Sequence, residues 1–259
     1  MSDLVILKLG GSVITDKKTP FSYRSEVVAR IGREVFRCWP TPLLIIHGGG
    51  SFGHTIAREY GIAQGYRELR QLEGFVKTIQ AMRELNSRIV QTLIETGIGA
   101  VGMPASLLFV TRDGSIETAL LDTLFSALDI GVIPVTCGDA VFDRERKFTI
   151  LSGDTIAVYL AKRLKARRLV FATDVDGIYE TDRNTGEKKL VEELGQKRHA
   201  SIIYHPVNDV TGGMFSKVDE AFGAVAAGVD VIFVNGLVEG RVEAAVKGEK
   251  VKGTRLTKS

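Results

Sequence analysis

The chain alternates between short apolar runs and longer amphipathic segments. The apolar runs are rich in β-branched residues and end at glycines or polar turns, which predicts strands, and the spacing between them predicts helices. Because the runs are apolar at consecutive positions, we expect a mostly parallel sheet covered by helices on both faces. The predicted strands are Leu4–Leu9, Pro42–Ile46, Ala100–Met103, Val132–Thr136, Arg168–Thr173 and Val229–Val234, and the predicted helices are Ser25–Cys38, Leu72–Glu95, Ser126–Leu128, Asp154–Leu164, Lys217–Ala227 and Arg241–Val246.

Three segments depart from this alternation. Leu108–Glu117 predicts a hairpin that turns at Asp113-Gly114, and Ala140–Leu151 predicts a second that turns in a charged DRERK stretch. The polar segment Glu180–Ala200 predicts a loop. No internal repeat or low-complexity linker divides the sequence, so we expect one continuous domain over residues 1–259, with two lobes.

The charge balance argues against a nucleic-acid-binding surface. Lysine and arginine number 34 against 31 acidic residues, a net charge of +3, without a concentrated basic face. A local basic site for a small anion remains compatible with this balance.

No targeting or membrane segment is predicted. The start MSDLVILKLGG lacks a basic, then apolar, signal pattern, and no apolar run reaches the ~18 residues of a membrane span. Cys38 and Cys137 lie far apart without metal-ligand spacing, which favours buried thiols in a reducing compartment. We therefore expect a cytoplasmic protein.

Glycine clusters mark three places where the main chain can contact a ligand. They are KLGGSVIT at residues 8–15, HGGGSFGH at 47–54 and DVTGGMFSK at 209–217, the last of which opens a predicted helix. Glycine lets backbone N–H groups approach an anion, and the carboxyl ends of parallel strands are where ligands bind. Neither a P-loop nor a dinucleotide fingerprint is present. A tight turn would explain any one cluster, but the three together favour a phosphate site.

Lysines accompany these clusters. Lys8 lies inside an apolar strand, where an unpaired charge is costly, so it either extends to solvent or points into a phosphate-binding cleft; we favour the cleft. Lys17 follows the first glycine turn, and Lys217 follows Gly213 by four residues. Lysines around such turns suit phosphoryl transfer, which depends on positioning and charge stabilisation.

Carboxylates at segment ends are further candidates. Asp154 in LSGD, or Ser152 before it, is placed to cap a helix, and a helix N-terminus also faces the ligand side of the sheet. Asp174 and Asp176 in FATDVDGIY end a strand, where they either orient a lysine, contact a nucleotide or simply form an Asp-Gly turn.

The ordered motifs KLGGSVIT, HGGGSFGH, LSGD, ATDVDGIY and DVTGGMFSK resemble the amino acid kinase superfamily and, within it, the isopentenyl phosphate kinases. The resemblance runs from Lys8 to about Thr254, where VKGTRL is similar to the family's last strand. The narrower resemblance depends on His54 in GSFGH, because related carboxylate kinases usually lack that histidine.

This resemblance implies an open αβα sandwich with a mostly parallel central sheet. It implies ATP with Mg2+ as phosphoryl donor and isopentenyl phosphate as acceptor, giving isopentenyl diphosphate for isoprenoid biosynthesis by an alternative mevalonate route. It further implies a homodimer, an acceptor-binding lobe at about residues 1–150 and a nucleotide-binding lobe at about 151–259.

The resemblance also implies residue roles. Residues expected to bind ATP are Lys8, Gly10, Gly11, Ser12, Gly49, Asp174, Gly213 and Lys217. Residues expected to bind the acceptor are Gly48, Gly53, His54 and Gly153. Residues expected to act in catalysis are Lys8 between the β- and γ-phosphates, Lys17 on the transferring phosphoryl group, His54 on the acceptor's phosphate, and Asp154, which would organise the lysines.

The acceptor chemistry fits these residues. A phosphate acceptor is already ionised and needs relief from anion repulsion more than a general base, which a histidine donor and lysines supply. Phe75, Ile79 and Met82 share one helical face, so they either line a slot for the isoprenoid tail or pack in the core. His47, at the end of an apolar strand, is expected to be structural.

Other functions remain open at this point. A fosfomycin-type phosphonate kinase resembles the same glycine–histidine loop, and a carboxylate or nucleoside-monophosphate kinase is a further alternative. A non-catalytic nucleotide sensor on the same fold is a third, although such a protein has no need to keep Lys8, Lys17, Asp154 and Lys217.

Overall fold

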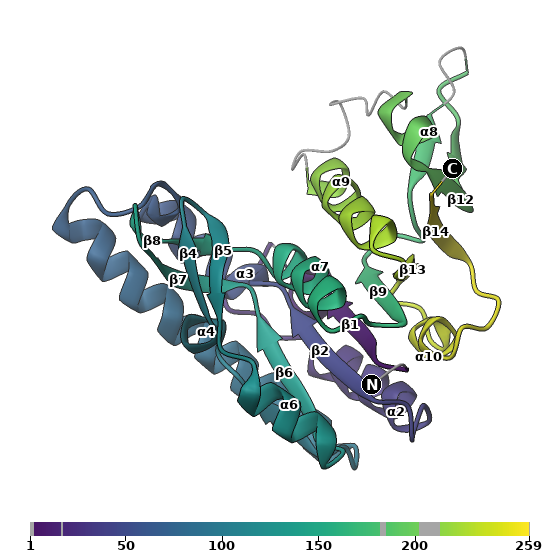
Figure 1. Ribbon diagram of the computed structural model, residues 1–259, viewed down its shortest axis with the longest axis horizontal. Helices are drawn as coiled ribbons and strands as arrows, with labels where there is room; N and C mark the ends of the chain where they lie inside the picture. Colours follow the sequence, from purple (N-terminus) through teal and green to yellow (C-terminus); the bar gives the residue numbers. More distant parts are fainter. Residues whose placement is uncertain (1–2, 17, 182–184, 202–212, 259) are drawn as a thin grey trace.

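A single mostly parallel sheet forms the centre of the molecule (Figure 1). The computed structural model describes residues 3–16, 18–181, 185–201 and 213–258. All neighbouring strands of this sheet are parallel except one antiparallel pair near its edge. The sheet order is β12 (Glu193–Gly195), β14 (Gly253–Thr257), β13 (Asp230–Asn235), β9 (Arg168–Thr173), β1 (Val5–Leu9), β2 (Leu43–His47), β6 (Ile133–Cys137) and β3 (Ala100–Gly102).

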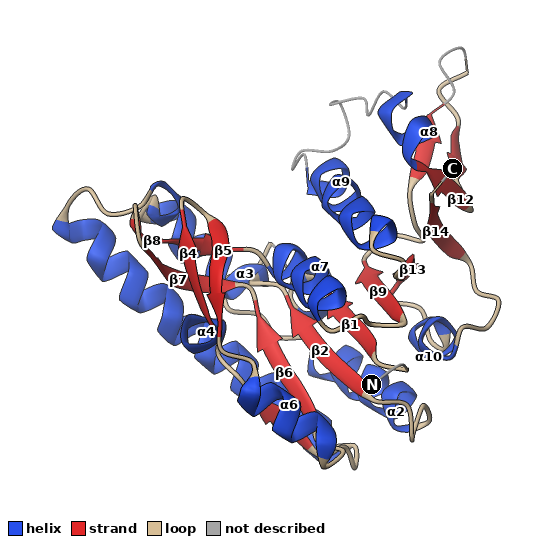
Figure 2. Cartoon of the chain, in the orientation of Figure 1, coloured by secondary structure: helices blue, strands red, loops and turns tan. Residues whose placement is uncertain are grey.

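Helices cover both faces of the sheet, as the apolar strands predicted (Figure 2). Val5 and Leu7 of β1 pack on one face, whereas Ile6 between them and Leu4 just before the strand pack on the other, so two hydrophobic cores sandwich the sheet. One face is covered by α1 (Gly11–Ile14), α2 (Ser25–Phe36), α3 (Gly50–Glu59), α4 (Leu69–Glu95) and α10 (Arg241–Lys247). The other is covered by α5 (Ala105–Leu108), α6 (Asp122–Asp129), α7 (Gly153–Arg163) and α9 (Gly213–Ala226).

Both predicted hairpins are present and join in a second sheet. Its order is β5 (Ser115–Ala119), β4 (Phe109–Arg112), β7 (Asp139–Asp143) and β8 (Lys147–Leu151). A third, small core lies beneath it, where Phe75 of α4 stacks on Phe148 at 4.6 Å between ring centroids, and Ile62 of a short 3-10 helix (Ile62–Gln64) joins them.

The central αβα sandwich with its mostly parallel sheet is therefore confirmed, with all the predicted strands and helices present. Both cysteines are buried and free, as expected. The prediction of a loop over Glu180–Ala200 is wrong. This segment contains part of β10 (Tyr179–Thr181), then β11 (Lys188–Leu190), β12 and most of α8 (Gln196–Ser201). Strands of three residues that carry charged side chains are too short and too polar to show a period in the sequence. The division into two lobes stays a prediction.

The glycine clusters begin helices rather than simple turns. The first cluster continues into α1 and the second into α3, as the third does into α9. Only the third of these helices was predicted. Glycine is a poor helix former, so nothing in the local composition of either cluster predicts a helix.

Candidate active site

A cleft of about 900 Å3 opens at the carboxyl ends of the central strands. Four neighbouring strands, β9, β1, β2 and β6, each contribute the residues that follow them. This is the edge of a parallel sheet where ligands bind. The contributing residues are Thr173 at the end of β9 and Asp174 after it, Gly10, Gly11 and Ser12 after β1, Gly48 and Gly49 after β2, and Gly138 and Asp139 after β6.

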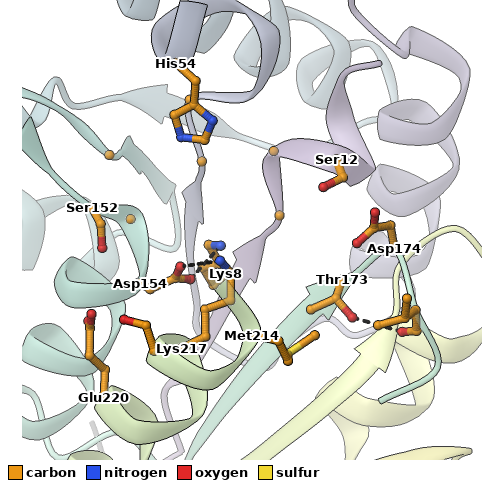
Figure 3. A pocket seen from close by; sticks show the side chains of 18 of the residues that line it. Lys8, Ser12, His54, Ser152, Asp154, Thr173, Asp174, Met214, Lys217 and Glu220 are labelled. Atoms are coloured by element: carbon orange, nitrogen blue, oxygen red, sulfur yellow. Dashed lines mark hydrogen bonds and ion pairs between the residues drawn. The ribbon is translucent and has the colours of Figure 1, made fainter. Parts of the chain in front are cut away.

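An ion-paired cluster lies in this cleft (Figure 3). Asp154 is in the first turn of α7, and its Oδ1 lies 2.6 Å from Nζ of Lys8. Its Oδ2 lies 3.2 Å from Nζ of Lys217 on α9. Lys8 is only 4% exposed, so the pairing explains how a strand interior tolerates its charge. The structure thus brings together three of the predicted residues from three separate elements.

The electrostatics keep this cluster charged. Burial alone would raise the pKa of Asp154, but Lys8 and then Lys217 outweigh burial and hold that pKa below its ordinary value of 3.8. Asp154 is therefore ionised near neutral pH. One carboxylate between two ammonium groups leaves a net positive charge, which suits the phosphate groups of a nucleotide.

A second hydrogen-bonded group lies beside this cluster. Ser152 is the N-cap of α7 and accepts from the backbone N of Thr155 at 3.0 Å. The Thr155 hydroxyl donates to Oε2 of Glu220 at 2.8 Å, which ties α7 to α9 one turn away from Lys217. Burial and the neighbouring Asp154 raise the pKa of Glu220.

Glycines in the cleft let two loops approach each other. A Cβ atom on Gly11 would lie 2.7 Å from both Cα and N of Gly50, and one on Gly48 would lie 3.0 Å from N of Gly11. Gly50 has a φ of +50°, and a Cβ there would overlap the side chain of Thr15. The loops after β1 and β2 are therefore packed backbone against backbone, which only glycine permits.

A second part of the cleft begins at α3, away from the lysine cluster. Its exposed His54 lines the cleft together with Gly49 and Gly53, and it projects from α3 at a distance from the lysine cluster (Figure 3). Beyond it the wall becomes mostly apolar, with Thr78 as its polar member. The residues of this wall are Ala57, Thr78, Met82, Ile150 and Leu151.

Most predicted site residues line the cleft. These are Lys8, Gly10, Gly11, Ser12, Gly48, Gly49, Gly53, His54, Gly153, Asp154, Asp174 and Lys217. Gly213 is the first residue of α9, and Lys17 lies outside the described residues. Of the three residues suggested for the tail slot, Met82 lines the cleft, whereas Phe75 and Ile79 pack in the small core beneath the second sheet.

Other cleft residues were missed by the sequence reasoning. Gly138 and Asp139 come shortly after a predicted strand as a Gly-Asp pair, where ligands bind in a parallel sheet, and could have been found. Glu220 lies one helical turn after Lys217 on the same helix, which is also a readable signal. Asp176 instead pairs with Arg241 at 2.6 Å and Lys252 at 2.7 Å, and these contacts give it a structural role.

Fold and site together define a phosphate-binding α/β protein with the charge arrangement of a phosphotransferase. Residues 3–235 match the model of the amino acid kinase family, so the chain belongs to that family. The isopentenyl phosphate kinase of Methanothermobacter thermautotrophicus is 37% identical over 264 residues, covering 98% of this chain and 99% of the relative. The isopentenyl phosphate kinase of Methanocaldococcus jannaschii is 33% identical over 268 residues, covering 98% of both chains.

A solved structure agrees with these relatives. An X-ray structure of isopentenyl phosphate kinase superposes with a TM-score of 0.87 at 34% identity, covering 98% of this chain and all of the other. An N-acetylglutamate synthase from Neisseria gonorrhoeae, at 18% identity and a TM-score of 0.72, shares the fold alone. No helix among the described residues is both long and apolar enough to cross a membrane.

Proposed function

We propose that this protein is an ATP-dependent kinase that transfers the γ-phosphoryl group to isopentenyl phosphate, giving isopentenyl diphosphate and ADP. The observation that carries the proposal is the cleft itself, which joins a lysine–aspartate cluster to a histidine and an apolar wall. The full-length similarity to isopentenyl phosphate kinases supports the same acceptor. The reaction is proposed to serve isoprenoid biosynthesis.

In this proposal the charged cluster binds the transferring phosphates. Lys8 spans the β- and γ-phosphates, Lys217 contacts the nucleotide, and Asp154 fixes both ammonium groups before ATP arrives. Fixed charges of this kind lower the barrier to transfer because they need no reorganisation during the reaction. Backbone N–H groups at the start of α7 and α3 add donors for phosphate oxygens. Lys17 is proposed to stabilise the transferring group.

The acceptor is proposed to lie on the α3 side. Its phosphate would accept from His54, with Gly48, Gly53 and Gly153 shaping the space around it. Its short hydrocarbon tail would lie along the apolar wall that includes Met82. Removal of the tail from water against this wall would favour binding of an alkenyl group. An already ionised phosphate nucleophile needs no general base.

The acceptor is proposed to lie mainly against a lobe at about residues 1–150 and the nucleotide mainly against a lobe at about 151–259, where Asp174 and Gly213 would serve ATP. The carboxylates that line the cleft are Asp139, Asp154, Asp174 and Glu220, and the part of the chain that the structure describes contains no group of three or more acidic, histidine or cysteine side chains that could hold a metal ion. Mg2+ is therefore proposed to be held chiefly by ATP phosphate oxygens, which are hard ligands of the kind it prefers. A homodimer is proposed from the family resemblance, and light scattering would test it.

The test is ADP release with Mg-ATP against a panel of acceptors: isopentenyl phosphate, dimethylallyl phosphate, fosfomycin, UMP and N-acetylglutamate. We expect a strong preference for isopentenyl phosphate. Turnover of fosfomycin, UMP or N-acetylglutamate alone would keep the lysine assignments and replace the acceptor. If ATP bound but no acceptor were turned over, a nucleotide sensor would replace the kinase.

A further inference from the structure

His47 is a buried histidine that the proposed reaction does not use. It ends β2, immediately before the glycines that line the cleft, and its side chain is 0% exposed. Its Nδ1 lies 3.0 Å from the carbonyl oxygen of Gly48, and its Nε2 lies 3.1 Å from Nδ2 of Asn86 on α4. A buried ring with a partner at each nitrogen has one defined orientation.

These two partners also select one tautomer. The Asn86 amide nitrogen is a donor, and its second contact, 3.2 Å to the carbonyl oxygen of Val135, confirms the orientation of that amide. Nε2 of His47 must therefore accept, which leaves the proton on Nδ1, where it donates to the carbonyl of Gly48. Both hydrogen bonds are satisfied only by the neutral ring protonated at Nδ1.

The surroundings keep the ring neutral. Burial lowers the pKa of His47 to about 4, because it outweighs the opposing effect of the Gly48 hydrogen bond, and the charge of Lys8 adds a smaller lowering contribution. At neutral pH the ring cannot act as a cation toward phosphate. Its effect on the cleft must come through the backbone that it holds.

The peptide between Gly48 and Gly49 transmits this effect. In a trans peptide the C=O and N–H groups point in opposite directions. The carbonyl of Gly48 is turned toward His47, whose ring lies on the side of the sheet covered by α4. The N–H of Gly49 is therefore directed to the opposite side, where Lys8 pairs with Asp154.

Gly49, which the family resemblance assigns to ATP, also lies beside His54 of the proposed acceptor site. Gly49 lines the cleft, and a Cβ atom built on it would lie 3.4 Å from Cδ2 and 3.6 Å from Nε2 of His54. Glycines on both sides of the peptide impose little conformational preference of their own. Hydrogen bonding by His47 is thus what distinguishes this peptide orientation from a flipped one.

We propose that His47 is a positioning residue that locks the Gly48–Gly49 peptide so that the N–H of Gly49 donates to the acceptor's phosphate beside His54. The inference rests on the proposed function for the identity of the acceptor. The positioning role of His47 requires only that an anionic group binds at this point of the cleft.

Two substitutions of His47 separate its two hydrogen bonds. His47→Asn places an amide nitrogen where Nδ1 lies and retains a donor to Gly48, whereas His47→Gln reaches the position of Nε2 and loses that donor. We expect His47→Asn to keep the acceptor KM within about threefold of wild type and His47→Gln to raise it about tenfold or more, with an unchanged KM for ATP. Equal acceptor KM values for variants of equal Tm would overturn the proposal.

NMR tests the same inference without turnover. The 15N shifts of His47 should show a neutral ring protonated at Nδ1 between pH 6 and 8, and addition of inorganic phosphate should shift the Gly49 amide signal in wild type. A ring protonated at Nε2, or a Gly49 amide signal that does not shift when phosphate is added, would refute the proposal even if both His47 variants failed to fold. If these signals behave as expected while isopentenyl phosphate is not turned over, the proposed function fails and the positioning role stands.

Discussion

Nζ of Lys8 lies 2.6 Å from Oδ1 of Asp154, which joins the middle of the central sheet to the first turn of α7. The lysine is buried among apolar strand residues, so its charge is stable there only because the carboxylate is fixed. The same carboxylate orients Lys217 with its other oxygen. One residue therefore sets the positions of two cations in the cleft.

Replacement of Asp154 should disable the site and weaken the fold. We expect Asp154→Asn to lower kcat about 100-fold or more, because the lysines lose their fixed orientation. It should also reduce the free energy of unfolding by about 3 kcal/mol, because buried Lys8 loses its partner. The pKa of Asp154 is depressed, so its contribution is complete above pH 3.8 and is lost only as the pH falls further. Kinetics and urea unfolding at pH 7 would measure both effects.

The control for this substitution is Asp129→Asn, at an exposed position near the end of α6. It removes the same charge from the chain far from the cleft and should leave kcat and stability unchanged. An Asp154→Asn variant with kcat within twofold of wild type would remove Asp154 from the catalytic assignments.

The link between α7 and α9 should affect ATP more than the acceptor. Thr155→Val removes the hydroxyl that donates to Glu220 and frees α9, with Lys217, to shift. We expect the KM for ATP to rise about fivefold, the effect of one hydrogen bond, with little change for the acceptor. Glu220→Gln retains an acceptor for Thr155 and should remain close to wild type. A raised KM for ATP in Glu220→Gln, with wild-type kinetics in Thr155→Val, would show that the charge of Glu220 and not its hydrogen bond matters.

The sequence allowed the central fold to be predicted because buried strands and amphipathic helices differ in composition and period. It could not predict the strand order, since that order depends on contacts such as Val5 with Arg168, which are distant in the chain. It also failed for the short strands β10, β11 and β12. Backbone pairing holds these strands in place, and three residues are too few to show alternation.

The site was predictable where a residue conflicts with its surroundings. Lys8 stands out because a lysine in an apolar strand requires a partner, and the structure supplies Asp154. The glycines are less specific. A glycine shows that a Cβ is not tolerated but not what fills the space, and at Gly11 and Gly50 the neighbour is the other loop's backbone. Phe75 and Ile79 follow the core-packing alternative and not the tail slot. The sequence could not decide between the two, because a shared helical face does not reveal which neighbour covers it.

The backbone contact between the two glycine loops gives a stability prediction. Gly11→Ala would place a Cβ 2.7 Å from Gly50, so one loop must shift. We expect a loss of about 2 kcal/mol in the free energy of unfolding and a lower kcat. Gly99→Ala is the matched control, because no atom lies within 4 Å of a Cβ built on Gly99. It should change neither the free energy of unfolding nor kcat. Identical melting curves for the two variants would contradict the backbone packing described for these loops.

His54 and Lys17 should differ in the kinetic constant that they affect. We expect His54→Ala to raise the acceptor KM about 100-fold or abolish turnover while ATP still binds, because a phosphate loses its donor. Lys17→Met should mainly lower kcat, as expected for a group that acts in the transition state. Glu59→Ala, an exposed position on the same helix as His54, is the control. Wild-type acceptor kinetics in His54→Ala would exclude His54 from the acceptor site.

Asp139 should give the protein an unusual dependence of stability on pH. Burial raises the pKa of this cleft carboxyl from 3.8 to about 7. The unfolded chain therefore loses the proton first, and the free energy of unfolding should fall as the pH rises from about 4 to 7 and then level off. Asp139→Asn removes this dependence, so between pH 5 and 8 the variant should gain about 3 kcal/mol relative to wild type. Urea unfolding of both proteins across this range would measure the difference, with Asp129→Asn as the reference. A constant offset between the two plots of unfolding free energy against pH would show that Asp139 is ionised in the folded protein throughout this range.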